Sequence, residues 1–210
     1  LLFARVYGVP KNRRRAFIFA LRNDVMQEDI NWPPPPTHHK SGGHPWLTAS
    51  SAFEKPNSLI LDTFRKRLEE KFGHSKEESD QIVSSLKCDK KLDPQDSCKL
   101  SMTHSETLTK VFENTPLLGD RDESGRELDC HKNYKGHKDV YGRIYPHLPS
   151  NTITTGCNNP SKGRFVHPWL HHGITLRHAA RLQTFPDDYM FTGGSIAMAK
   201  QIGNAVPVAM

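Results

Sequence analysis

The chain has 210 residues, 35% hydrophobic and 9% aromatic, and this predicts one domain, or one domain and part of another, and not a disordered chain. The net charge of +6 fits a nucleic-acid partner, although many unrelated proteins share it. No apolar run has the length of a transmembrane helix and no signal peptide is recognised, so no membrane partner is predicted.

The cysteines and histidines predict no metal site. The four cysteines, Cys88, Cys98, Cys130 and Cys157, include no CxxC pair, which a zinc site would commonly contain. The twelve histidines are scattered along the chain, and we expect surface or loop positions for them. We expect an intracellular protein with reduced thiols, in the cytoplasm of a bacterium or the nucleus of a eukaryote.

Residues 1–24 form the first block of the chain. Three consecutive arginines precede the run "AFIFAL" at residues 16–21. Six residues without polar alternation predict a strand that is buried on both faces, as in a parallel α/β sheet. Such a strand needs neighbours on both sides, and no second run of this quality occurs. We therefore expect most of the sheet to lie outside this chain, and the apolar start without an initiator Met also predicts a piece of a longer protein.

The next part of the chain is predicted to alternate between loops and helices. Residues 31–48 contain four consecutive prolines and a glycine pair, which predict a rigid connecting loop. Apolar spacing in residues 57–87 predicts two helices, divided at Gly73, and Ser75 with Glu78 resembles a capping box for the second. Residues 88–139 are polar, and long irregular loops are expected there.

The last third carries the clearest sequence signals. A β-branched run at residues 152–155 precedes a cationic turn at residues 158–164. An amphipathic helix is predicted over residues 174–185, with Thr175 as its N-cap. A final helix is predicted to begin near Ile196, to be interrupted by a Gly-Asn pair and to continue beyond the end of the chain.

Three features suggest chemistry, and each has a simpler structural explanation. The arginines before the predicted strand could hold a phosphate or a base, or could form a solvated turn. The polar turn at 158–164 could approach a DNA groove, or lie on the surface. The Gly203-Asn204 pair could present helix amides to a small ligand. Cys157 lacks a neighbouring acid or base in the sequence, and a packed thiol is expected there.

Taken together, five segments in fixed order resemble the C-terminal half of DNA cytosine-5 methyltransferases. They are "YGVPKNRRRAFIFALRND", "LPSNTITT", "NPSKGRFVHP", "ITLRHAARLQTFPDDYMF" and "QIGNAVP". The resemblance covers residues 1–24 and 140–210 well. Residues 25–139 match only in their position and their "PPPPTH" start.

The resemblance implies an α/β fold. The chain would be the C-terminal part of a Rossmann-like, S-adenosyl-L-methionine-dependent methyltransferase domain with an inserted small, irregular α+β target-recognition domain. Residues 1–24 would end the catalytic sheet, residues 25–170 would form the target-recognition domain, and residues 171–210 would return to the catalytic domain. The implied partners are double-stranded DNA and an N-terminal half, in the same chain or in a partner subunit.

The family mechanism needs residues that this chain lacks. In the family the target cytosine is flipped out of the duplex, a cysteine thiolate attacks C6, a glutamate contacts N3 and C5 receives the methyl group. The cysteine belongs to a Pro-Cys motif and the glutamate to a Glu-Asn-Val motif. Neither motif occurs here, and no cysteine of the chain follows a proline.

Site residues are implied where this chain matches the family motifs. Arg13 and Arg15 match the arginines that hold the flipped cytosine and its flanking phosphate. Lys11 stands where glutamine is usual and could still reach a phosphate, and Arg14 is placed with the DNA-binding residues. The turn from Gly156 to Arg164 lies where the family has a DNA-reading loop. The DNA-binding candidates in it are Asn158, Ser161, Lys162 and Arg164.

Two further sets of residues match motifs. The motif that organises the recognition domain is matched by Arg143, Pro149, Thr152, Ile153 and Thr154. The turn that closes over S-adenosyl-L-methionine is matched by Gly203, Asn204, Ala205 and Val206.

Three interpretations stay open from the sequence. The chain is a catalytic fragment, a natural recognition subunit of a split methyltransferase, or a non-catalytic DNA-binding remnant. The absent initiator Met and the truncated last helix favour the fragment. The matches at Arg13, Arg15 and the Gly-Asn turn argue against the remnant, which would not need a cofactor turn. The DNA target sequence, and a restriction-linked or an epigenetic role, stay open as well.

Overall fold

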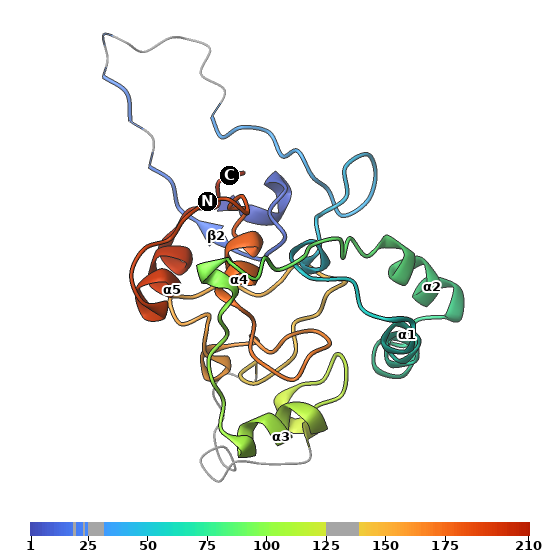
Figure 1. Cartoon of the computed structure of the whole chain (residues 1–210). Helices are drawn as coiled ribbons and strands as arrows, with labels where there is room; N and C mark the ends of the chain where they lie inside the picture. Colours follow the sequence, from blue (N-terminus) through green and yellow to red (C-terminus); the bar gives the residue numbers. More distant parts are fainter. Residues whose placement is uncertain (19, 23, 25–31, 125–138) are drawn as a thin grey trace.

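The computed structural model describes residues 1–18, 20–22, 24, 32–124 and 139–210. In this part of the chain, helices are joined by long loops, and a two-stranded antiparallel sheet pairs β1 (Leu2–Phe3) with β2 (Arg14–Arg15) (Figure 1). The 3-10 helix η1 (Ala4–Tyr7) follows β1 directly. Within the same residues, no helix combines the length and the apolar character that a bilayer crossing needs.

The predicted buried strand over residues 16–21 is wrong for the described part of that run. Strand β2 ends at Arg15, and Ile18 is 97% exposed. An extended backbone needs neighbours for its N–H and C=O groups. The two residues of β1 pair only with Arg14 and Arg15, so the apolar run has no strand beside it among the described residues. Phe19 lies outside the described residues.

The two helices predicted over residues 57–87 are confirmed as α1 (Ser58–Phe72) and α2 (Lys76–Ser85), which pack against each other. Gly73 ends α1 in the left-handed conformation with φ 69°, which glycine adopts without a steric penalty. Ser75 and Glu78 form the predicted capping box of α2.

One helix interrupts the region that was predicted to be irregular. Helix α3 (Glu106–Asn114) is capped by Ser105, whose hydroxyl accepts the N–H of Leu108. Val111 and Phe112 are buried, and the spacing of these apolar residues fits one helical face. Its apolar residues are few and the surrounding sequence is polar, so the sequence pattern did not predict this helix. The 3-10 helices η4 (Ser97–Lys99) and η5 (Arg121–Ser124) also lie in this region.

Helix α4 (Leu176–Leu182) begins at the predicted N-cap, because the Thr175 hydroxyl accepts the N–H of His178. The prediction that this helix is amphipathic is wrong, since all its residues are buried. Neighbouring segments supply partners for its cations: Arg177 Nε bonds Asp96 Oδ2 over 2.5 Å and Arg181 bonds Asp187. The helix packs against η3 (Ala49–Ala52), η4 and α5 (Ser195–Asn204).

Helix α5 begins as predicted, but Gly203 and Asn204 belong to its last turn. The predicted interruption by a Gly-Asn turn, with the helix continuing afterwards, is therefore wrong. The chain leaves the helix at Ala205, and Pro207 follows.

The main hydrophobic core joins residues from Ala49 to Ile202, including Phe53, Ile153 and Leu182. It therefore runs across the predicted domain boundary at residue 170, and the boundaries themselves stay predictions. Figure 1 shows α5 beside α4, with α1 and α2 on the other side of the molecule.

Candidate functional site

The segment from Lys11 to Arg15 is extended, and its side chains alternate between two environments. Lys11 and Arg13 are buried, whereas Asn12 and Arg14 are exposed. Backbone bonds fix the segment, because the Asn12 N–H donates to Ser150 O over 2.7 Å. The Thr152 hydroxyl donates to Asn12 O over 2.7 Å. The first predicted motif therefore lies directly against the second.

Arg13 connects three of the matched motifs. Its Nη1 donates to the carbonyl oxygen of Ile153 over 3.0 Å and to that of Gly203 over 2.9 Å. The side chain is 4% exposed. Charge-assisted hydrogen bonds of this kind are among the stronger ones in proteins. Arg13 therefore ties the predicted recognition motif to the end of α5.

Lys11, two residues before Arg13, makes a similar connection through Gln183. Its Nζ donates to Gln183 Oε1, and Gln183 Nε2 donates to Ile202 O over 2.5 Å. Burial, and after it the nearby charge of Arg15, lower the pKa of Lys11 to about 7. Arg13 thus bonds a C-terminal carbonyl of α5 directly, where the helix dipole favours positive charge, and Lys11 is connected to the neighbouring carbonyl through Gln183.

Gly203 is needed for close packing and not for a turn. A Cβ on Gly203 would lie 2.4 Å from the backbone carbon of Thr154 and 2.4 Å from the nitrogen of Thr155. Gly203 is in the last turn of α5, so it does not present amides from a helix start, and its carbonyl bonds Arg13. Beyond it, Asn204 and Val206 are exposed and Ala205 is half-buried.

The predicted DNA-reading turn contains the 3-10 helix η7 (Pro160–Lys162), capped by the side chain of Asn159. Lys162 is exposed, and Asn158 and Ser161 are half-buried. Arg164 differs from them. It is buried, bonds the Asp120 carboxylate, donates to Arg143 O over 3.1 Å and lies over the Tyr145 ring at 4.3 Å. The structure gives Arg164 a packing position that does not present it to a ligand.

The recognition motif has a buried cation at its centre. Arg143 donates to backbone carbonyls of two segments, including Thr115 O at 2.9 Å and His167 O at 2.9 Å. Burial lowers its pKa to about 10. Ile153 is in the hydrophobic core, while Thr152 and Thr154 are exposed and Pro149 is half-buried.

The described cysteines are packed thiols. Burial raises the pKa of Cys157 to about 12 and that of Cys88 to about 12, and burial also raises the pKa of Cys98. A thiolate is the reactive form of cysteine, so these groups are poor nucleophiles in this environment. Cys130 lies outside the described residues.

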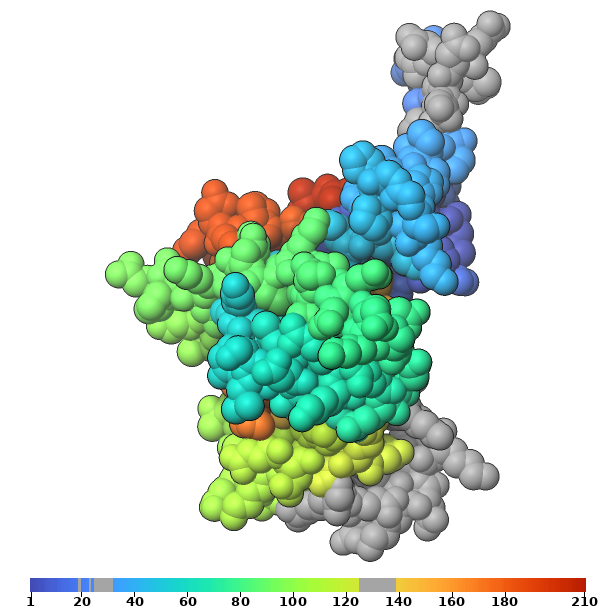
Figure 2. All heavy atoms as spheres, turned by 90° about the vertical axis from the view of Figure 1, so that its right-hand side faces the viewer, coloured from blue at the N-terminus to red at the C-terminus, as the bar shows by residue number. Residues whose placement is uncertain are grey.

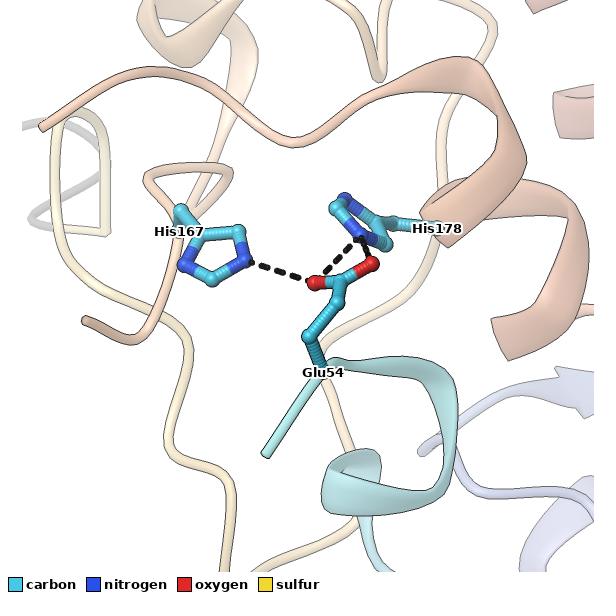
Figure 3. A group of neighbouring side chains, drawn as sticks. All are labelled: Glu54, His167 and His178. Carbon is cyan, nitrogen blue, oxygen red and sulfur yellow. Dashed lines mark hydrogen bonds and ion pairs between the residues drawn. The ribbon is translucent and has the colours of Figure 1, made fainter. Parts of the chain in front are cut away.

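A cluster that sequence reasoning missed joins Glu54, His167 and His178 (Figure 3). His178 Nε2 lies 3.0 Å from Glu54 Oε1, and His167 Nε2 lies 3.5 Å from Glu54 Oε2. Both imidazoles are fully buried. Burial alone would raise the pKa of Glu54, but the bonds from the two histidines outweigh it and hold that pKa well below its usual range. No local pattern connects Glu54 with histidines more than 100 residues away.

The donor set of this cluster does not fit a metal ion. The His167 Nδ1 accepts the N–H groups of Trp169 and Leu170, and the His178 Nδ1 accepts the N–H of Thr175. Both rings therefore carry their proton on Nε2, directed at the carboxylate. A histidine that binds metal through Nε2 would need its proton on Nδ1, facing these N–H donors. The cluster is instead a clamp that joins three segments: His178 at the start of α4 hydrogen-bonds Glu54, and His167 directs Nε2 at the same carboxylate from 3.5 Å.

Comparisons with known proteins match the sequence over the whole chain. The family model of the C-5 cytosine-specific DNA methylase matches residues 1–210. The chain is similar to the type II methyltransferase M1.BsuMI of Bacillus subtilis, with 40% identity over 99% of this chain and 40% of that protein. It is also similar to the type II methyltransferase M.BbvI of Brevibacillus brevis, with 28% identity over 96% of this chain and 42% of that protein.

A shorter match has higher identity. The type II methylase M.HgiDII of Herpetosiphon aurantiacus is 47% identical over 39% of this chain and 25% of that protein. The chain thus spans less than half the length of these curated relatives.

Proposed function

The chain belongs to the C-5 cytosine-specific DNA methylase family, and from this premise we propose that it is the C-terminal part of a DNA (cytosine-5) methyltransferase. The proposed reaction transfers a methyl group from S-adenosyl-L-methionine to C5 of a cytosine that is flipped out of double-stranded DNA. The proposed architecture is a Rossmann-like catalytic domain with an inserted target-recognition domain, of which this chain carries the second part.

The observation that carries the proposal is the position of Arg13 between two functional segments. On one side lies Ile153, next to the exposed Thr152 and Thr154. On the other side lies the end of α5, after which Asn204 leads the chain away. A methyltransferase must hold DNA and cofactor at a fixed separation, because misplacement by about 1 Å can cost about 100-fold in rate. A DNA-binding remnant would have no need for this connection.

The DNA contacts are proposed for side chains that the fold leaves accessible. Lys162, Asn158 and Ser161 would meet the DNA from the turn, and Arg15 would hold the flipped cytosine from the edge of β2. Lys11, Arg13 and Arg164 are buried, so we propose that they position these contacts instead of making them. This changes the roles that the resemblance alone implied for them.

The end of α5 fits a cofactor contact in part. The exposed Asn204 amide can donate and accept hydrogen bonds, and the exposed Val206 offers an apolar surface. The Gly203 carbonyl and the space at its Cβ are already occupied by Arg13 and Thr154. Asn204, Ala205 and Val206 would therefore hold S-adenosyl-L-methionine, which supplies the methyl group when bound. Gly203 would set the position of this turn.

The nucleophile and the glutamate are proposed to lie in an N-terminal half, because their motifs do not occur in this sequence. That half would belong to the same chain or to a partner subunit. Several apolar side chains near β2 and α5 are exposed and could be covered by it. They are Leu1, Ile18, Val206 and Val208.

The test is transfer of labelled methyl from S-adenosyl-L-methionine to cytosine in DNA. The chain is assayed alone and together with an N-terminal half that carries the Pro-Cys and Glu-Asn-Val motifs. We expect activity only in the mixture, and Cys157→Ser should retain it because that thiol is buried. Activity of the chain alone would overturn the proposed location of the nucleophile. No activity from halves that demonstrably associate would favour the DNA-binding remnant.

A further inference from the structure

Two arginines and two aromatic rings alternate on the surface beside the segment from Lys11 to Arg15. Arg14 Cζ lies 4.2 Å from the Phe3 ring centroid, Arg5 Cζ lies 4.9 Å from the same ring, and Arg5 Cζ also lies 4.0 Å from the Trp46 ring. Each distance is within the range of a cation–π contact. We call the set Trp46, Arg5, Phe3 and Arg14 the cation–aromatic ladder. Figure 2 shows the light-blue segment that includes Trp46 lying against the N-terminal residues.

A pocket of about 430 Å³ lies next to the ladder. Arg5, Lys40, Trp46 and His147 contribute to its walls, with the loop at residues 148–151. Burial lowers the pKa of His147 to about 4, so the charge of the walls comes from Arg5 and Lys40. The residues that line this pocket include no carboxylate. The pocket is therefore cationic without a neutralising partner in its own lining.

Several polar atoms of this pocket lack partners within the described part of the chain. Arg5 Nε, Trp46 Nε1 and His147 Nδ1 are buried and make no hydrogen bond. Buried polar groups are nearly always paired, and these three atoms belong to residues that line one pocket. Arg5 Nη1 donates one hydrogen bond to Asn12 Oδ1 over 3.1 Å.

The chemistry of the ladder suits a polymer of phosphates. When an arginine stacks on an aromatic ring, the flat face of its guanidinium contacts the ring. The N–H groups at the edge of the guanidinium then stay available to acceptors that lie in the guanidinium plane. Phosphate oxygens are such acceptors. Arg5 and Arg14 share the Phe3 ring, and Lys40 adds a third cation in the lining of the pocket. Repeated cations beside aromatic rings are the arrangement that proteins use along nucleic-acid backbones.

Asn12 connects this surface to the proposed substrate site. It accepts from Arg5, and its neighbours Lys11 and Arg13 point inward to the end of α5. We propose that the cation–aromatic ladder and Lys40 bind the sugar–phosphate backbone of the substrate DNA strand. This inference rests on the proposed function and adds a phosphate-binding surface to it. The surface would fix the register of the DNA relative to Arg15.

The test is the salt dependence of duplex DNA binding by the full 210-residue chain, measured by fluorescence anisotropy. Each lost phosphate contact should reduce the slope of log K against log salt by about 0.9. We expect this reduction for Arg5→Ala, Arg14→Ala and Lys40→Ala. The matched control is Lys66→Ala, which removes the same charge from the exposed face of α1, and its slope should equal that of the wild type.

Three further variants separate the stacked geometry from charge alone. Trp46→Leu keeps every cation but removes the ring under Arg5, and we expect a several-fold loss of affinity, which Trp46→Phe should restore in large part. Arg5→Lys keeps the charge and should also lose affinity. Circular dichroism and urea unfolding establish that each variant is folded, and an unfolded Arg5→Ala leaves Arg14→Ala, Lys40→Ala and Trp46→Leu to decide.

The outcomes distinguish this inference from the function on which it rests. Binding that depends on Lys162 but has wild-type slopes in Arg14→Ala and Lys40→Ala would overturn the phosphate-binding surface alone. A slope that Lys66→Ala lowers equally would do the same, because the effect would be one of net charge. An absence of duplex binding by the wild-type chain, even when it is associated with the N-terminal half, would overturn both.

Discussion

The Arg13 guanidinium donates to the carbonyl oxygen of Gly203 over 2.9 Å, although the two residues are 190 positions apart in the sequence. The same Nη1 also donates to Ile153 O. This pair of bonds brings the first and the last matched motif of the chain to one point in the fold. A side chain that the family resemblance suggests as a ligand for DNA is thus a buried connection between two segments.

Arg13→Ala should destabilise the protein strongly. It removes two charge-assisted bonds to buried carbonyls, each worth about 1.5–3 kcal/mol, and we expect the free energy of unfolding in urea to fall by about 3 kcal/mol or more. Arg14→Ala is the matched control, because Arg14 is the exposed neighbour and its loss should cost less than about 1 kcal/mol. Equal costs for the two variants would contradict the assignment.

Gly203→Ala should be destabilising even though alanine is the better helix former. Its Cβ would meet the Thr154 and Thr155 backbone at 2.4 Å, and backbone cannot move aside cheaply. Forced overpacking of this kind costs about 1–3 kcal/mol. Gly43→Ala, where a Cβ meets nothing within 4 Å, should change the free energy of unfolding by less than about 1 kcal/mol. Thermal and urea unfolding measure both, and a neutral Gly203→Ala would refute the close approach.

Mild acid should destabilise the protein through the clamp of Glu54, His167 and His178. Burial lowers the pKa of His167 to about 3, and burial also lowers the pKa of His178. Below about pH 6.5 the unfolded chain binds protons that the folded histidines refuse, so the free energy of unfolding falls as the pH falls. The expected slope is about 1.4 kcal/mol per pH unit for each histidine, down to the folded pKa.

Other charged groups around the clamp act on the same titration. Arg181 Nη1 lies 3.8 Å from Glu54 Oε1, and the His172 ring lies 5.2 Å from that of His167. Urea unfolding between pH 7 and pH 4 measures the slope. His167→Asn keeps an acceptor near the position of Nδ1. Because it removes one titrating group, it should reduce the slope of the free energy of unfolding against pH by about 1.4 kcal/mol per pH unit. A stability that is independent of pH over this range would contradict the neutral, Nε2-protonated state of both rings.

Arg15→Ala should lower methyl transfer in the completed enzyme while leaving the chain folded. Arg15 is half-buried at the open edge of β2, and its Nη1 bonds only the neighbouring Arg14 carbonyl among the described hydrogen bonds. Loss of one preorganised cationic contact to a reacting group costs about 100-fold in rate. Single-turnover methyl transfer measures the effect, and Lys66→Ala should keep the wild-type rate. Unchanged transfer by Arg15→Ala would show that the role implied for it is wrong.

Lys162→Ala and Arg164→Ala should have opposite signatures although both remove a cation from one turn. Lys162 is exposed, so its loss should weaken DNA binding or relax sequence choice with little change in stability. Arg164 is buried against Asp120 and Tyr145, so its loss should lower the free energy of unfolding by about 3 kcal/mol. DNA titration and urea unfolding of both variants test this contrast, and a stable Arg164→Ala with weakened DNA binding would reverse it.

The sequence by itself determined the ends of several helices and the family. Helices α1 and α2 follow from apolar spacing, and their ends follow from Gly73 and from the Ser75–Glu78 capping box, because caps depend on residues within one turn. Thr175 marked the start of α4 for the same reason. The family follows from ordered motifs, which need no knowledge of contacts.

Only the tertiary structure decided which side chains of those motifs face inward. Along Lys11–Arg15, the contacts with Ser150 and Ile153 decide which of the alternating side chains are buried. Arg164 can be buried because its charge is paired with Asp120. The clamp at Glu54 joins segments that are remote in sequence, so no local sequence pattern predicts it. The apolar run at residues 16–21 shows the converse, since a strand propensity becomes a strand only where another backbone accepts its hydrogen bonds.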